Sequence, residues 1–176
     1  MPSYVAFLRA INLGANRKFP KDAIRAAVEG AGCTDVETHI NTGNVRLTTS
    51  MRSRARIETT LEDAFLTDRG FEVPTIVFPT AELAQVGRDA EELNRPDLAR
   101  HYIWLLKDEP SAEVVDRVHA LDGDGHRAVI RGRACHLLLA EGYEQGAVDP
   151  LRTEKLLGVA TNRNFNVVTT LARKWC

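Results

Sequence analysis

The stretch DVETHINTGNVRLTT, residues 35–49, decides the fold. Residues 35–40 and 44–49 have the β-prone composition of two short strands, and NTGN at 41–44 is typical of the hairpin turn between them, with Gly43 free to adopt positive φ. Residues 3–12 predict a strand before this hairpin, and residues 71–78 predict one after it. Because Pro74 cannot donate to a β-ladder, the last strand should lie at an edge of the sheet or carry a bulge.

The two segments that connect these strands outside the hairpin contain apolar residues at helical spacing. Ala23 to Ala31 predict a helix that ends at Gly32, and Ile57, Leu61 and Phe65 mark a second helix. The resulting order, β-α-β-β-α-β, is that of the ferredoxin-like unit. We therefore expect strands 3–12 and 44–49 side by side in the middle of an antiparallel sheet.

The second half of the chain repeats this order of elements. We predict a strand at 101–107, a helix at 111–121 capped by Ser111, a tight hairpin over 126–140 through Gly132, a short helix at 149–158, a short strand at 159–163 and a last helix. The predicted fold class is α+β, with two tandem ferredoxin-like βαββα(β) units, antiparallel sheets and a C-terminal helix. The predicted domains are 1–80 and 101–176, with a helical linker at 81–100.

Composition restricts the function classes. The 176 residues carry a net charge of −1, although residues 1–56 hold nine Lys and Arg residues against four Asp and Glu residues. No apolar run approaches the ~20 residues of a membrane span, and the N-terminus shows no signal peptide. Three widely spaced cysteines, Cys33, Cys135 and Cys176, fit neither a disulfide framework nor a zinc site. We expect a cytoplasmic protein without metal or cofactor; its oligomeric state is open.

The predicted topology places the end of the first strand beside the turn at 41–44. Polar and basic residues would gather there: Arg9, Asn12, Gly14, Asn16, Lys18, Thr42, Gly43 and Asn44. Backbone amides at the two glycines and the cations of Arg9 and Lys18 suit an anion or a polar planar ligand. Asn and Gly are also favoured in turns for conformational reasons alone, so a purely structural role remains open.

A second polar group, ATNRNFNVVTTLARKW at 160–175, opens the last helix. Asn164 as N-cap would satisfy one free amide of the first turn. Other free amides beside Arg163 would form a positive pocket, and Asn162 and Asn166 exceed the need for capping. We rank capping with interdomain hydrogen bonds slightly ahead of a ligand site. The hypothesis for the whole protein is that all three polar segments meet at one pocket.

Three segments, RAINLGANRKFP, HINTGNVRL and TNRNFNVVTTL, resemble the signature motifs of an uncharacterised family, domain of unknown function 1697. Arg9, Asn12, Gly14 and Lys18 fall on the first motif, Gly43 and Asn44 on the second, and Arg163, Asn164 and Asn166 on the third. Among the departures are Phe165 in place of Trp, Val167 in place of Thr and Thr170 in place of Lys. The resemblance implies the location of a polar cluster and no reaction.

Three functions follow in order of preference. The first is a binding module for an anionic small molecule or nucleotide at the Asn/Arg/Lys cluster. Nucleic acid is a weaker alternative, because the central strands lack the exposed aromatic residues of RNA-recognition sheets. The second is a structural or partner-interaction role for the polar motifs. The third, an enzyme acting on a phosphorylated or carboxylated metabolite, has no evident general base. The histidines show no metal-ligand spacing, and Glu58 and Glu62 are expected to be exposed.

Overall fold

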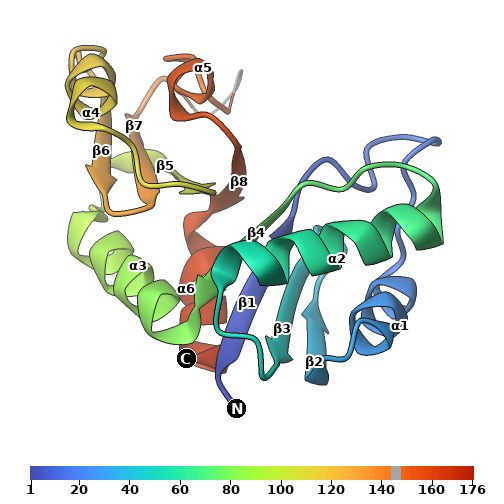
Figure 1. Ribbon diagram of the computed structural model, residues 1–176. Helices are drawn as coiled ribbons and strands as arrows, with labels where there is room; N and C mark the ends of the chain where they lie inside the picture. Colours follow the sequence, from blue (N-terminus) through green and yellow to red (C-terminus); the bar gives the residue numbers. More distant parts are fainter. Residues whose placement is uncertain (144–147) are drawn as a thin grey trace. The chain divides into compact units, whose positions relative to one another are not determined.

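The computed structural model describes residues 1–143 and 148–176, which form two compact units (Figure 1). The first unit comprises Met1–Leu83 with Trp175, and the second comprises Ala84–Lys174 with Cys176. Each unit contains a four-stranded antiparallel sheet, so the predicted α+β class with two tandem ferredoxin-like units is confirmed. The boundary between the units falls inside a helix, α3 (Thr80–Leu93), within the stretch where a linker was expected.

The first unit contains β1 (Ser3–Leu8), α1 (Lys21–Gly30), β2 (Thr34–His39), β3 (Asn44–Thr48), α2 (Arg54–Arg69) and β4 (Thr75–Pro79). Its sheet has the order β2-β3-β1-β4, with β1 and β3 in the middle as the sequence predicts. β4 is an edge strand, and Pro74 lies just before it rather than within it.

The core of the first unit lies between its sheet and the two helices α1 and α2. Phe19 and Phe65 meet edge to face with ring centroids 5.2 Å apart, and Ile24 of α1 packs in the same cluster. The helix α2 begins at a Ser53 side chain that accepts a hydrogen bond from the Arg56 amide. It ends at Gly70, whose φ of 76° is the left-handed conformation common at helix C-termini.

β1 ends four residues earlier than expected. Ala10 and Asn12 have φ values of 56° and 55°, a left-handed conformation that does not continue a strand. The backbone therefore turns after Leu8, although the Arg9 amide still donates to the Pro74 carbonyl. This turn leads into the polar loop 9–20.

The expectation that Glu58 and Glu62 are exposed is wrong. The Glu58 side chain is buried, with 2% of its residue surface exposed, and accepts hydrogen bonds from the Val77 amide at 3.0 Å and from Arg54 at 3.2 Å. Glu62 accepts from the Thr75 amide at 2.9 Å. These carboxylates of α2 therefore satisfy backbone donors of the edge strand β4, a use that helical spacing alone does not reveal.

The second unit contains β5 (Leu98–Leu106), α4 (Ala112–His119), β6 (His126–Arg131), β7 (Ala134–Ala140), α5 (Glu154–Leu157), β8 (Ala160–Asn164) and α6 (Phe165–Trp175). Its strand order is β6-β7-β5-β8, the same topology as in the first sheet. The hairpin through Gly132 and the Ser111 cap are confirmed. The helix predicted at 149–158 is shorter, because Asp149 accepts from the Thr153 and Glu154 amides and the helical turn begins only there.

Two layers of helices enclose the second sheet. On one face, Val118 of α4 and Leu157 of α5 pack against Trp104 and Leu137 of the sheet. On the other face, Asp89 of α3 contacts Arg131 of β6, and Phe165 of α6 stacks on His101 of β5. α3 and α6 approach each other closely, since a Cβ on Gly87 would lie 2.6 Å from the Cβ of Ala172. Within the described residues, no helix combines the length and the apolar character that crossing a membrane requires.

Candidate functional site

Asn12 of the first polar segment is committed to the backbone around it. Its side-chain oxygen accepts from the Phe19 amide at 2.8 Å, and its side-chain nitrogen donates to the Phe19 carbonyl at 3.1 Å and the Asn41 carbonyl at 2.7 Å. The last of these bonds joins the loop after β1 to the turn before β3. The structure therefore brings the first two polar segments together, as the topology predicts.

The second polar segment is also tied into the hairpin. The buried Asn44 side chain donates to the His39 carbonyl at 3.1 Å and to the Thr42 hydroxyl at 2.9 Å. The Gly43 carbonyl accepts from the Leu8 amide at 2.8 Å, and Gly43 itself has a φ of 80°. A Cβ at this position would lie 2.7 Å from the Cβ of Leu8, so glycine is required by both conformation and space.

Arg17 is a residue of this loop that the sequence did not single out. Its guanidinium donates to the Ala10 carbonyl at 2.5 Å and to the Glu72 carbonyl at 2.6 Å, and it lies 4.7 Å from the centroid of the Phe71 ring. Arg17 thus holds the loop against the segment before β4. Sequence pattern gave no signal for this role, because one arginine among several in a basic loop looks like any other.

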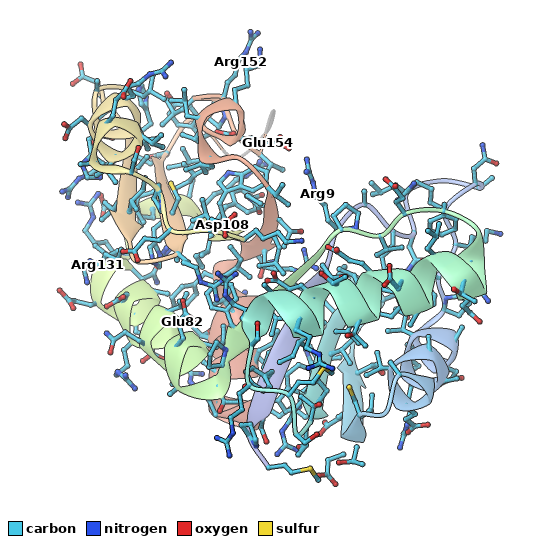
Figure 2. The ribbon with its side chains drawn as sticks, in the orientation of Figure 1. Arg9, Glu82, Asp108, Arg131, Arg152 and Glu154 are labelled. Atoms are coloured by element: carbon cyan, nitrogen blue, oxygen red, sulfur yellow. The ribbon has the colours of Figure 1, made fainter. Side chains whose placement is uncertain are left out.

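The other members of the first cluster lie nearer to solvent. Gly14, Asn16, Lys18 and Thr42 are exposed, and Arg9 is half-buried. Figure 2 shows the Arg9 side chain projecting from the end of β1. Gly14 has a φ of 78° and nothing within 4 Å of the position of a Cβ. This end of the first sheet is therefore a polar, cationic surface over a firmly hydrogen-bonded loop.

The third polar segment belongs to the second unit. Arg163 of β8 is 8% exposed and donates to the Thr161 hydroxyl at 2.9 Å and to the Asn162 carbonyl at 2.8 Å. Burial lowers the pKa of its guanidinium to about 10. Asn164 is the N-cap of α6, as predicted, because its side-chain oxygen accepts from the Val167 amide at 2.9 Å. The meeting of all three segments stays a prediction.

A pocket of about 260 Å³ opens at the start of α6 within the second unit. Its walls include Asn94, Arg100, His101, Tyr102, Asn164 and Asn166. The two asparagines of the third polar segment thus line a cavity, and both are exposed. Arg100 lies 6.0 Å from the centroid of the Tyr102 ring and contributes a cation to the wall. Free amides at the N-terminus of α6 add partial positive charge on the same side.

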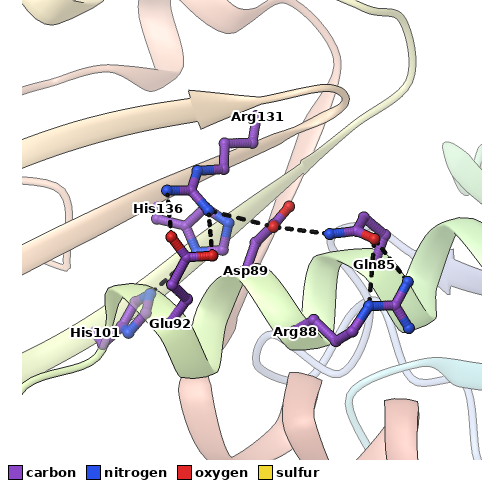
Figure 3. Close-up of polar contacts among 7 residues, drawn as sticks. All are labelled: Gln85, Arg88, Asp89, Glu92, His101, Arg131 and His136. Carbon is purple, nitrogen blue, oxygen red and sulfur yellow. Dashed lines mark hydrogen bonds and ion pairs between the residues drawn. The ribbon is translucent and has the colours of Figure 1, made fainter.

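His101 connects this pocket to a buried partner, His136 (Figure 3). The His101 Nε2 and His136 Nδ1 atoms are 3.1 Å apart, and His101 Nδ1 is 3.2 Å from the Asn94 side-chain oxygen. The His101 ring also stacks on Phe165, with centroids 5.3 Å apart. Burial lowers the pKa of His101 to about 4 and that of His136 to about 3, so both rings are neutral at pH 7.

An ionic group lies beside the histidine pair. Arg131 of β6 donates to Asp89 at 3.3 Å and to Glu92 at 3.2 Å, both on α3, and Gln85 donates to the same Asp89 oxygen at 2.9 Å (Figure 3). The charges of Asp89 and Arg131 act on the pKa of His136 in opposite directions. These contacts hold α3 against β6. Because Asp89 and Arg131 carry opposite charges, their effects on the pKa of His136 partly cancel.

The described part of the chain offers little for metal or covalent chemistry. It contains no group of three or more His, Cys, Asp or Glu residues that could hold a metal ion. Cys135 is buried in the sheet, and desolvation raises the pKa of its thiol to about 12, which removes its nucleophilic form at neutral pH.

Comparisons with known proteins agree with this fold. The solved structure of the conserved bacterial protein SP0830 from Streptococcus pneumoniae superposes with a TM-score of 0.69 at 22% identity, covering 99% of each chain. At this identity the likeness shows the fold alone. The search of curated proteins finds no match. The family described as "Protein of unknown function (DUF1697)" matches residues 1–136, which include the first two polar segments. This chain is therefore a member of the DUF1697 family.

Proposed function

We propose that this protein is a binding module for an anionic small molecule or nucleotide. The observation that carries the proposal is the pocket at the start of α6, where Asn164 and Asn166 stand beside Arg100 and His101. Side-chain amides provide both hydrogen-bond donors and acceptors, and Arg100 with the positive end of α6 provides attraction for negative charge. Small-molecule sites commonly enclose ~300–1,000 Å³, so a cavity of about 260 Å³ suits a compact ligand.

A second surface belongs to the same proposal. Arg9 and Lys18 stand at the cationic end of the first sheet, next to the backbone of Gly14. The loop beneath them is fixed by Asn12 and Arg17, which hold it in one conformation. A preformed loop lowers the conformational cost of binding. This surface is the weaker of the two, because its asparagine side chains bond to the protein's own backbone.

The same hydrogen bonds favour a structural role as the second candidate function. Asn12 makes three bonds to backbone atoms, and Asn44 makes one to a backbone carbonyl and one to Thr42. Such residues hold turns whether or not a ligand is present. Under this reading, the first two polar segments serve the fold and function lies in a contact with a partner. In the described part of the chain no cysteine forms a disulfide, which fits the reducing cytoplasm inferred for either function.

A thermal-shift comparison tests the binding proposal. The ligands are adenosine monophosphate, ribose 5-phosphate and sulfate, each added to the wild type, to Asn166→Ala, to Arg100→Ala and to the double variant Arg9→Ala/Lys18→Ala. A ligand at a hundredfold excess over its Kd stabilises the folded state by about 2.7 kcal/mol, which raises the Tm by several degrees.

We expect at least one ligand to raise the Tm of the wild type, and the pocket variants to lose that response while the double variant keeps it. A response lost only in the double variant would move the site to the first sheet. If no ligand raises the Tm, the binding proposal is wrong and the structural role takes its place.

A further inference from the structure

The histidine pair has one arrangement of protons that satisfies its neighbours. The Asn94 side-chain oxygen can only accept, so the facing His101 Nδ1 carries a proton and donates it. In a neutral ring this leaves His101 Nε2 as an acceptor, and His136 Nδ1 must then donate to it. His136 Nε2 is left as a buried acceptor with no hydrogen-bond partner among the described residues.

This arrangement can take up one proton and place its charge at the pocket. The proton adds to His136 Nε2, and the proton between the rings moves from His136 Nδ1 to His101 Nε2. His101 then carries both of its protons, donating one to Asn94 and one to His136 Nδ1. The sum is one proton gained and one positive charge on His101, the ring that lines the pocket.

We propose that ligand binding in this pocket is coupled to proton uptake by the His101–His136 pair, so that an anion is bound together with one proton. The proposal rests on the proposed function, since it describes the regulation of the same site. An anion in the pocket would stabilise the charged form of His101. By thermodynamic linkage, protonation of His101 would then increase the affinity for the anion by the same factor. Affinity should therefore rise as the pH falls.

The groups around the pair allow this charge. α3 presents Asp89 and Glu92, β6 presents Arg131, α6 presents the Phe165 ring, and Asn94 lies beyond the end of α3. Arg131 opposes a positive charge on His136, while Asp89 favours it. The carboxylates of Asp89 and Glu92 are already paired with Arg131, so neither neutralises His101. The charge is placed on His101 because both of its N–H groups then have acceptors, Asn94 and His136 Nδ1.

Asn94→Asp tests the coupling without any ligand. Asn94 is exposed, so the variant should fold, and it places a fixed carboxylate on His101 Nδ1. An opposite charge at this range raises a histidine pKa by about 1–3 units. We expect the pKa of His101, followed by NMR of the ring Cε1–H over a pH range that extends below its wild-type value of about 4, to rise by at least 1 unit. Asn94→Gln is the neutral control and should change little. An unchanged pKa in Asn94→Asp overturns the proposal.

Sulfate binding tests the coupling between anion binding and proton uptake, because the charge of sulfate itself is constant over the pH range of the experiment. For a shift of about 1.5 units in the pKa of His101, linkage predicts about twofold tighter binding at pH 5.5 than at pH 7.5, and about eightfold at pH 4.5. Calorimetry in two buffers of different ionisation enthalpy should show proton uptake at the lower pH. His136→Gln removes the atom that takes up the added proton, so this uptake should decrease. The proton uptake that remains in the variant includes that of carboxylates titrating near pH 4.5, and it is subtracted from the wild-type value.

The outcomes separate the two proposals. Sulfate binding that Asn166→Ala abolishes, but that shows no proton uptake and no dependence on His136, overturns the coupling and leaves the proposed function intact. An absence of sulfate binding at every pH overturns both. If His136→Gln fails to fold, the Asn94→Asp titration still decides the matter, because it alters only an exposed residue.

Discussion

Asparagine plays different parts in the two units of this molecule. In the first unit, the side-chain amides of Asn12 and Asn44 bond mainly to backbone atoms of the loop and hairpin that contain them. In the second unit, Asn164 uses its oxygen to cap α6, and it lines a pocket with Asn166. A polar motif therefore has to be judged by what its side chains already bond to, since residue types alone look the same in both units.

The largest effect expected from this comparison is at Gly43. Gly43→Ala should destabilise the protein by about 3 kcal/mol, because a methyl group would meet the Leu8 Cβ at 2.7 Å in a left-handed conformation. Gly14→Ala is the matched control, with a φ of 78° and open space around it, and should cost about 1 kcal/mol. Urea unfolding of both variants measures the difference. Equal losses would show that packing at the hairpin contributes nothing.

Asn12 comes next. Asn12→Ala should cost about 2 kcal/mol, since three hydrogen bonds are lost and alanine is disfavoured at a φ of 55°. Asn12→Gly removes the same bonds and relieves the backbone, so it should cost about 1 kcal/mol. Both values come from urea midpoints at equal m-values. A loss below about 0.5 kcal/mol in Asn12→Ala would contradict the structural assignment of the first segment.

Asn164 combines both roles of the asparagines, because it makes a structural contact and also lines the pocket. Asn164→Ala should lower the stability by about 1 kcal/mol through loss of the helix cap. Asn164→Ser keeps a capping oxygen and should restore most of that stability. If the serine variant is as unstable as the alanine variant, capping is not what Asn164 contributes.

The smallest effect on stability is expected at Asn166. It is exposed in the first turn of α6, and Asn166→Ala should change the free energy of unfolding by less than about 0.5 kcal/mol. The same variant should lose the thermal response to ligand described above, whereas Thr170→Ala, an exposed change on the same helix outside the pocket lining, should keep it. A large loss of stability in Asn166→Ala would make the third polar segment structural as well.

Sequence was sufficient for the topology because its signals are local. The NTGN turn with Gly43, the Gly132 hairpin and the helical periodicity of Ile57, Leu61 and Phe65 each depend on residues close together in the chain. Together they define the order of strands in both sheets. The end of β1 was misjudged because Ala10 and Asn12 adopt left-handed conformations, and only the contacts of Asn12 and Arg17 make these favourable.

Features that depend on register between distant elements could not be predicted. Glu58 and Glu62 have the spacing of any solvated helix face, and their burial follows only from where α2 lies against β4. The histidine pair joins positions 101 and 136, which become neighbours because β5 pairs with β7 so that Ile103 is opposite His136. The bulge between Leu98 and Arg100 shifts the pairing at one end of this ladder, and no local residue pattern predicts this bulge.

The carboxylates of α2 have a consequence for how the protein behaves in a crowded solution. The outer edge of β4 presents the Thr75 and Val77 amides, which would otherwise accept a strand from another chain. Glu62 and Glu58 accept hydrogen bonds from these two amides. A strand of another molecule that approached this edge would find its hydrogen-bond donors taken. The β4 edge of the first sheet is thereby closed to intermolecular growth, and protection from aggregation at this edge is built into the same contacts that anchor the helix.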